Sequence, residues 1–217
     1  MAEFTIYLGN KNYSSWSLRG WLMLQHTGAA FDEVVIPLEE ANTRANIMRH
    51  SPSARVPALR HDELVIWETL AIGEYLAELF PNARLWPEAA AARATARAVS
   101  QEMHAGFAAL RSHLPMNIRS TFPNRGVTPE AQADLNRIVA LWRDCRKRFG
   151  ADGDFLFGHF TIADAMYAPV VSRFRTYKVE LDPESQRYAD AVWALRSIQD
   201  WVTAARNEPM IIEKYEF

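Results

Sequence analysis

Residues 12–17 (Asn-Tyr-Ser-Ser-Trp-Ser) place several hydroxyl groups directly before a helical pattern, where they could do chemistry. Serine is a preferred N-cap residue, so helix capping alone would explain Ser14 and Ser15. A hydroxyl at a strand-to-helix junction, beside the free N–H groups of a first helical turn, would also stabilise a bound anion. Taken alone the segment favours capping, and a chemical role requires partners elsewhere in the fold.

Two further segments would complete a site for a ligand that carries both charges of an amino acid. The Val56-Pro57 pair opens a predicted strand, and a cis bond there would cost only about 0.5–1 kcal/mol relative to trans. Such a bond would turn the backbone N–H and C=O of Val56 toward an extended peptide. Thr69 stands at the start of a predicted helix and could hold a carboxylate, while Glu68 could pair with an ammonium group. Each segment alone has an ordinary structural explanation, and together they predict a peptide-binding site.

Strands and helices alternate in the first 80 residues, which must position these segments. Residues 4–8 form an aromatic and β-branched run that predicts a strand, and residues 17–26 predict a helix that ends at Gly28. Further strands are predicted at 31–38, 56–59 and 64–67, and further helices at 43–49 and 70–80. The β-α-β start implies parallel strands joined through a helix, so we expect a sheet with helices packed on it.

Prolines within residues 81–87 interrupt this pattern, and every later element is predicted to be helical. Apolar residues recur at helical spacing over 88–114, over 129–149 and over 188–202, and each run is interpreted as one helix. Thr161 and Asp164 have the spacing of a capping box, so we assign both to folding. The sequence therefore predicts an α/β domain at residues 1–80 and an all-α domain at residues 88–217.

Composition argues against several classes of partner. The 24 basic and 26 acidic side chains leave a net charge of −2, which gives no general attraction to nucleic acid or to acidic membranes. The sequence has no window near the roughly 18 consecutive apolar residues of a spanning helix and no evident signal peptide. Its single cysteine, Cys145, cannot form an internal disulfide and is expected to be inert in an apolar helix face. We expect a cytoplasmic globular protein without a metal site.

These features resemble the cytosolic glutathione transferase family over essentially the whole chain. The β-α-β-α-β-β-α order, with Val56-Pro57 before the third strand and Glu68-Thr69 before the last helix, is similar to that family's thioredoxin-like N-terminal domain. The capping box after residues 158–160 is similar to its all-helical C-terminal domain. Residues 14–17 resemble the Ser-Ser-Cys-Ser segment of the zeta class, which includes maleylacetoacetate isomerases. The resemblance implies a bacterial, serine-type member.

The resemblance implies that glutathione is the co-substrate and that a serine hydroxyl stabilises its thiolate. It places the catalytic hydroxyl on Ser14, with Ser15 beside it, whereas an alignment on Arg19 would place it on Asn12. The residues that it implies in glutathione binding are Trp16, Arg55, Val56, Pro57, Glu68 and Thr69.

This chain departs from the family pattern at two positions of interest. Trp16 stands where the zeta class has cysteine, which argues against isomerase activity through that motif. Tyr7 stands where tyrosine-type transferases carry their activating hydroxyl. Because Tyr7 lies within an apolar run, we interpret it as structural.

The electrophilic substrate is expected to bind between the two domains. Met103, Phe107 and Arg111 are four residues apart on the predicted helix 88–114, so they would share one face. Side chains at this spacing are more often ordinary core, and both interpretations stay open. His104 on the same helix is a further candidate for a substrate contact or a supporting group, although a solvated histidine is favoured. Residues 209–212 would pack across the site or across the first domain, and both alternatives stay open.

Three functions compete at this point. The leading one is conjugation of glutathione to small electrophiles, and the second is glutathione-dependent cis-trans isomerisation of the maleylacetoacetate type. The third is a non-catalytic scaffold that keeps the fold but has lost thiol activation. The resemblance further implies a homodimer in which the first domain of each subunit pairs with the helical domain of the other.

Overall fold

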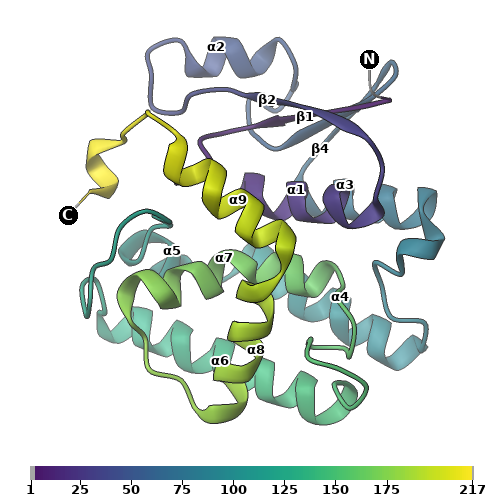
Figure 1. Ribbon diagram of the computed structural model, residues 1–217, viewed down its shortest axis with the longest axis vertical. Coiled ribbons are helices and arrows are strands. Elements are labelled where there is room, and N and C mark those ends of the chain that lie inside the picture. Colours follow the sequence, from purple (N-terminus) through teal and green to yellow (C-terminus); the bar gives the residue numbers. More distant parts are fainter. Residues whose placement is uncertain (1–2, 217) are drawn as a thin grey trace.

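The chain folds as a four-stranded sheet with helices on both faces, followed by a layer of helices (Figure 1). The computed structural model describes residues 3–216, so Met1, Ala2 and Phe217 of the predicted domain ranges lie outside the described residues. The predicted fold class, a thioredoxin-like domain followed by an all-helical domain, is confirmed.

The sheet has the strand order β2-β1-β3-β4. The central strand β1 (Phe4–Leu8) is buried at every residue and pairs in parallel with β2 (Phe31–Val35). On its other side β1 pairs antiparallel with β3 (Ala58–His61), which pairs antiparallel with β4 (Leu64–Trp67). The third strand begins two residues later than predicted, at Ala58, because proline at position 57 has no N–H to donate to a ladder.

Helices α1 (Ser15–Thr27) and α3 (Thr69–Leu79) cover the sheet face that is turned toward the second domain, and α2 (Thr43–Met48) lies on the opposite face (Figure 1). Helix α1 ends, as predicted, at Gly28 in the left-handed conformation with φ 76°. Gly20 lets α1 approach the start of β3 closely, because an added Cβ would lie 2.8 Å from Pro57 Cγ. The two segments that flank the candidate site are therefore held against each other by close packing.

The described part of the second domain is built around α7 (Ile162–Tyr177), which is buried along almost its whole length and packs against α1, α4 and α8. Its neighbours are α4 (Ala90–Ala105), α5 (Ala108–His113), α6 (Pro129–Phe149), α8 (Pro183–Ala194) and α9 (Arg196–Asn207). One apolar core joins both domains, since residues of β1, α1 and α3 belong to the same buried cluster as those of α7.

Two predicted single helices are each divided in the structure. The predicted helix 88–114 ends at Ala105, because Gly106 is extended and Phe107 takes a left-handed φ of 56°. The prediction that Met103, Phe107 and Arg111 share one helix face was therefore wrong. The predicted helix 188–202 is interrupted at Leu195, where ψ is 131°. A single non-helical residue leaves the apolar spacing almost intact, so periodicity alone missed this break.

The C-terminal segment after α9 returns to the first domain (Figure 1). The Glu208 carboxylate accepts hydrogen bonds from the backbone N–H groups of Lys11 at 2.8 Å and Asn12 at 3.1 Å. Arg119 donates to the carbonyl of Met210 at 2.9 Å and to the hydroxyl of Tyr13 at 2.8 Å. Residues 208–216, including η2 (Glu213–Tyr215), thus form a strap beside the start of α1, as the expected packing of residues 209–212 requires.

Across residues 3–216, no helix has the length and apolar character needed to cross a membrane.

Candidate active site

The hydroxyl of Ser14 is engaged in capping α1. Its Oγ accepts from Ser17 N at 3.4 Å, the N-cap bond, and donates its proton to Ser17 Oγ at 2.8 Å. Ser17 Oγ in turn accepts from Gly9 N at 2.8 Å. Ser14 is 7% exposed, and its proton already has an acceptor.

The hydroxyl of Ser15 has a different environment. It is also 7% exposed, and it accepts a long hydrogen bond of 3.4 Å from Nη2 of Arg173, which comes from α7. Within residues 3–216 this is its one hydrogen bond, so the Ser15 proton is free to be donated to a ligand. A hydroxyl that accepts from a guanidinium is a stronger donor, because hydrogen bonds in a chain polarise one another.

Asn12, the alternative position for the catalytic hydroxyl, is fully committed to structure. It is 0% exposed, its Nδ2 donates to Asn117 Oδ1 at 3.0 Å, and its Oδ1 accepts from Arg119 N at 2.9 Å. Both ends of the amide are therefore occupied in holding the loop before α1.

A hollow of about 250 Å³ lies beside these serines, between the first domain and the end of α4. All six residues that the sequence analysis implied in glutathione binding line this hollow. Its lining residues are Trp16, Arg55, Val56, Pro57, Glu68, Thr69, His104 and Arg111. Residues from three separate loops of the first domain are thus brought to one place.

The loops around this hollow present backbone groups as well as side chains. The Val56-Pro57 bond is cis. Glu68 has a positive φ of 69°, an uncommon conformation for a residue other than glycine, and Thr69 begins α3. The free N–H groups of the first turn of α3 thereby open beside the Glu68 carboxylate, which is 47% exposed.

A second hollow of about 280 Å³ continues from the first and shares Trp16 and Arg111 with it. Both Ser14 and Ser15 line this second hollow. Its other walls come from the loop after α5, from α7 and from the strap. The remaining lining residues are Tyr13, Leu38, Glu39, Pro115, Met116, Arg173, Ile212 and Tyr215. The two serines therefore line the second hollow, next to the residues that it shares with the first.

Two arginines lie over the Trp16 indole, and a third contacts the neighbouring Ser15. The guanidinium carbons of Arg19 and Arg111 lie 4.3 and 5.6 Å from the ring centroid, and Arg173 reaches Ser15 next to it. Burial, with repulsion from the other two arginines, holds the pKa of Arg19 well below its usual value. Burial also lowers the pKa of Arg173 to about 10. The site is electropositive, which favours an anion such as a thiolate.

The expected electrophile-site residues are not all at this site. Arg111 lines both hollows, whereas Met103 and Phe107 line neither. Met103 is 0% exposed and Phe107 is 7% exposed, and both belong to the apolar core. The break at Gly106 redirects the chain, so only the last of the three expected residues faces the ligand space.

His104 is partly exposed and lies at this site. Its side chain is 30% exposed, lines the first hollow, and lies 3.8 Å from the Glu68 carboxylate through Nε2. Its ring packs edge-on against Trp16, with centroids 5.1 Å apart.

Sequence analysis missed Arg173 and the strap residues Ile212 and Tyr215. The signal for Arg173 was present, because an arginine that follows the largely apolar run of residues 165–171 is expected to be buried and then needs partners. No comparable signal marks Ile212 or Tyr215, whose position depends on where the chain turns after α9.

Two residues that the sequence analysis assigned to structure lie away from the site. Tyr7 is 5% exposed and its ring stacks on His50 with centroids 4.2 Å apart. Cys145 is 1% exposed, and burial raises the pKa of its thiol to about 12, which keeps it protonated.

Asp164 also has a structural role, as expected. Its carboxylate accepts from the backbone N–H groups of Leu156 at 3.1 Å and Thr161 at 2.8 Å, and the Thr161 hydroxyl completes the capping box. These bonds hold the loop before α7, the helix that carries Arg173.

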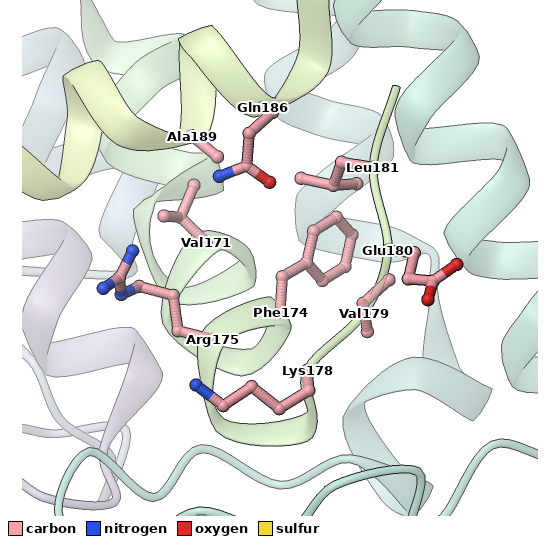
Figure 2. A pocket seen from close by; sticks show the side chains of 9 residues that line it. All are labelled: Val171, Phe174, Arg175, Lys178, Val179, Glu180, Leu181, Gln186 and Ala189. Atoms are coloured by element: carbon pink, nitrogen blue, oxygen red, sulfur yellow. The ribbon is translucent and has the colours of Figure 1, made fainter. Parts of the chain in front are cut away.

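A larger hollow, of about 510 Å³, lies between the end of α7 and α8 and offers less chemistry (Figure 2). Its base is formed by Phe174 and Val171, which are 3% and 0% exposed. At its rim Arg175 lies 3.6 Å from Asp190, and Gln186 donates to the same carboxylate at 2.9 Å. Its lining has no serine, cysteine or histidine, so the two hollows around Trp16 are the better candidate.

Both parts of the chain match known domain families. The family described as the glutathione S-transferase N-terminal domain matches residues 13–79, and the glutathione S-transferase C-terminal domain matches residues 88–196. The second match alone covers half of the chain.

Individual relatives are distant. The probable maleylacetoacetate isomerase of Caenorhabditis elegans is 27% identical over 78% of this chain and 78% of its own length. The stringent starvation protein A homolog of Coxiella burnetii is 24% identical over 84% of this chain and 81% of its own.

The fold is shared with solved structures. The crystal structure of a Burkholderia glutathione transferase homolog, which holds bound glutathione, superposes with a TM-score of 0.72. The two chains are 24% identical, and the match covers 94% of this chain and 99% of the homolog. At this identity the similarity shows the fold alone.

Proposed function

The chain belongs to the glutathione S-transferase family, and we propose that it activates the thiol of bound glutathione for attack on small electrophiles. One observation carries this proposal above the others. All six residues implied in glutathione binding line one hollow, and that hollow opens through Trp16 and Arg111 onto two serine hydroxyls at the start of α1.

Glutathione has one ammonium group and two carboxylates, and the hollow offers a partner for each end. In the proposed pose the Glu68 carboxylate pairs with the ammonium, and Thr69 with the free N–H groups of α3 holds the neighbouring carboxylate. Arg55 supplies a cation for the far carboxylate, and the backbone of Val56 lies alongside the peptide. Trp16 and Arg111 line both hollows, so in the proposed pose the sulfur passes beside them into the second hollow and reaches the serines there.

In the proposed mechanism Ser15 donates to the sulfur anion and Ser14 holds the helix start. The support is that the Ser15 proton is free, whereas the Ser14 proton is donated to Ser17 Oγ. A free thiol has a pKa near 8.5, and a useful thiolate fraction needs it lowered by about two units, or about 2.7 kcal/mol. A hydrogen bond to a charged group contributes about 1.5–3 kcal/mol and a helix N-terminus about 0.3–1 kcal/mol. These two contributions suffice without a metal or a general base.

Glutathione titration by calorimetry tests the binding half of this proposal. Wild-type protein should bind glutathione, and the Glu68→Gln variant should bind it more weakly because the ammonium loses its counter-charge. Absence of binding at millimolar glutathione would reject the transferase function and favour the scaffold function. The similarity to a stringent starvation protein A homolog is the observation that supports the scaffold as an alternative.

Isomerisation is the second candidate, and the similarity to a probable maleylacetoacetate isomerase favours it. It uses the same thiolate but returns it unchanged after rotation about the substrate double bond. Product analysis with a cis-dienoic acid distinguishes the two, since an isomerase yields the trans acid and a transferase yields the thioether.

We further propose a cytoplasmic homodimer, as the family resemblance implies. Light scattering at several protein concentrations tests the oligomeric state, and a monomer at micromolar concentration would contradict it.

A further inference from the structure

Three arginines from three different helices converge on Trp16. Arg19 lies in α1, Arg111 in α5 and Arg173 in α7. Arg19 and Arg173 are 0% and 3% exposed, so two of the three charges are almost fully removed from water. Buried charges are costly to the folded state unless they are paired.

The protein itself supplies little pairing for this cluster. Within residues 3–216, none of the three arginines has a carboxylate within ion-pair distance. Both terminal nitrogens of Arg19 are buried without a hydrogen-bond partner among these residues. Asp134 is the acid whose charge favours the protonated form of Arg111, and its Oδ2 also accepts from Leu110 N at 2.9 Å. The cluster therefore has more positive charge than the surrounding side chains neutralise.

Arg111 and Arg173 keep hydrogen-bond donors for a ligand. Arg111 donates one hydrogen bond, from Nη1 to the carbonyl of His104 at 3.1 Å. Arg173 donates to the carbonyls of Leu114 at 2.8 Å and Pro169 at 3.3 Å, besides its long bond to Ser15. A guanidinium has five N–H donors in a planar fork that matches a carboxylate, so both residues have donors left over.

We propose that the electrophile of this enzyme carries a carboxylate, which Arg111 and Arg173 bind in the hollow beside Ser15. This inference rests on the proposed transferase function and names its substrate class. A glutathione thiolate brings one negative charge to a cluster of three cations, which leaves charge for a second anion. Arg173 lines the second hollow and not the first, so a ligand that it binds would lie in the second hollow, away from the residues proposed to hold the peptide.

The rest of this hollow suits a short carbon frame. Beyond the arginines and the two serines most of its lining is apolar or aromatic, with Met116, Pro115, Ile212 and Tyr215 among them. The Glu39 carboxylate also lines it, and Lys214 Nζ neutralises that charge at 2.7 Å. A volume of about 280 Å³ admits one small unsaturated or aromatic acid, not a long lipid chain. With the carboxylate on the arginines, the ring or double bond extends toward Ser15, where the sulfur is held.

Matched electrophiles that differ only in charge test the proposal. In 4-chloro-3,5-dinitrobenzoate the thiolate sulfur bonds to the ring carbon that bears chlorine, the C–Cl bond breaks, and chloride leaves with the bonding pair. The thiol proton is lost to solvent. The methyl ester reacts by the same step without the negative charge. Chloride release or thioether absorbance then measures kcat/KM for both compounds.

The variant to compare is Arg111→Gln, because Arg111 is the least buried of the three. Its kcat/KM for the acid should fall about 10- to 100-fold, the loss expected for one charge-assisted hydrogen-bonded pair, while the ester changes less than about 3-fold. Arg173→Lys should show the same selectivity and keeps a cation if Arg173→Gln does not fold. Arg175→Gln, an exposed arginine of α7 that lies outside both hollows, is the matched control and should leave both rates unchanged.

Equal losses for acid and ester would overturn the inference, because they would mean that the arginines act only on the thiolate. Calorimetry with the unreactive 3,5-dinitrobenzoate decides the matter even without turnover. Binding of the acid that is lost in Arg111→Gln, with no binding of its methyl ester, supports the site, whereas no binding of the acid refutes it. Failure of the transferase function shows separately, as absence of glutathione binding in wild-type protein.

Discussion

Ser15→Ala and Ser14→Ala should separate thiol activation from helix capping. Ser15→Ala removes the hydroxyl with the free proton, whose one bond is the 3.4 Å contact from Arg173. Losing a hydrogen bond of about 1.5–3 kcal/mol to the sulfur anion would raise the pKa of the bound thiol by about 1–2 units. From a starting pKa near 6.5, the thiolate fraction at pH 7 would fall from about three quarters to between about a fifth and a fiftieth. Turnover at pH 7 should therefore drop about 4- to 40-fold and recover at higher pH.

Ser14→Ala should behave in the opposite way. It removes the N-cap bond to Ser17 N and the 2.8 Å bond to Ser17 Oγ, which supports the backbone of Gly9. Loss of an N-cap costs about 1 kcal/mol, which lowers the melting temperature of a domain of this size by about 2–4 °C. Thiol activation should be affected much less, because the removed proton was already donated within the protein.

The assay is the pH dependence of kcat/KM with a neutral electrophile, together with ultraviolet titration of the thiolate in the glutathione complex. Ser15→Ala should shift both profiles to higher pH while glutathione affinity and melting temperature stay near wild type. A shifted profile in Ser14→Ala with an unchanged one in Ser15→Ala would assign the donor to Ser14. Unchanged profiles in both variants would refute the serine mechanism altogether.

Three further outcomes are expected. Burial raises the pKa of Asp164 to about 6, above its unfolded value near 3.9, so the folded state binds more protons between these values and ionisation disfavours it. The free energy of unfolding of wild-type protein, measured by denaturant melts relative to that of Asp164→Asn, should therefore fall by about 2 kcal/mol as pH rises from about 4 to about 7. A difference between the two proteins that stays constant over this range would contradict the assignment. Cys145→Ala should retain full glutathione-dependent turnover, and mass spectrometry should find the Cys145 thiol unmodified by iodoacetamide in native protein, since it is 1% exposed. Arg119→Ala should release the strap at Met210, which limited proteolysis would detect as faster cleavage after α9, with lower turnover because Ile212 and Tyr215 line the second hollow.

Local chemistry made several elements of both domains predictable. The strand at Phe4–Leu8, the stop at Gly28 and the capping box of Thr161 and Asp164 were each read from a few adjacent residues, and the structure has all of them. The segments that we propose bind glutathione were likewise named from a few adjacent residues. Their convergence in one hollow follows from the order of strands in the sheet, which the sequence pattern and the family resemblance already implied.

Errors arose where an apolar pattern continued across a change of direction. The spacing of Met103, Phe107 and Arg111 is helical, yet Gly106 and the left-handed Phe107 end the helix between them. Glycine is about 1 kcal/mol less favourable than alanine inside a helix. The prediction gave this cost less weight than the apolar spacing on either side of Gly106. Packing of α5 against α6 decides the actual path, and that contact is not visible in adjacent residues.

The sequence by itself determined the elements, their caps and the set of polar residues available to a site. It did not determine which serine has a free proton, because that depends on Ser17, Gly9 and Arg173, and Arg173 lies 158 residues away from Ser15. Nor did it determine that three arginines meet at Trp16, since they come from three helices whose crossing brings them together. Hydrogen bonds and charges act over a few ångströms, so only the tertiary packing of α7 against α1 could decide which of these groups act on one another.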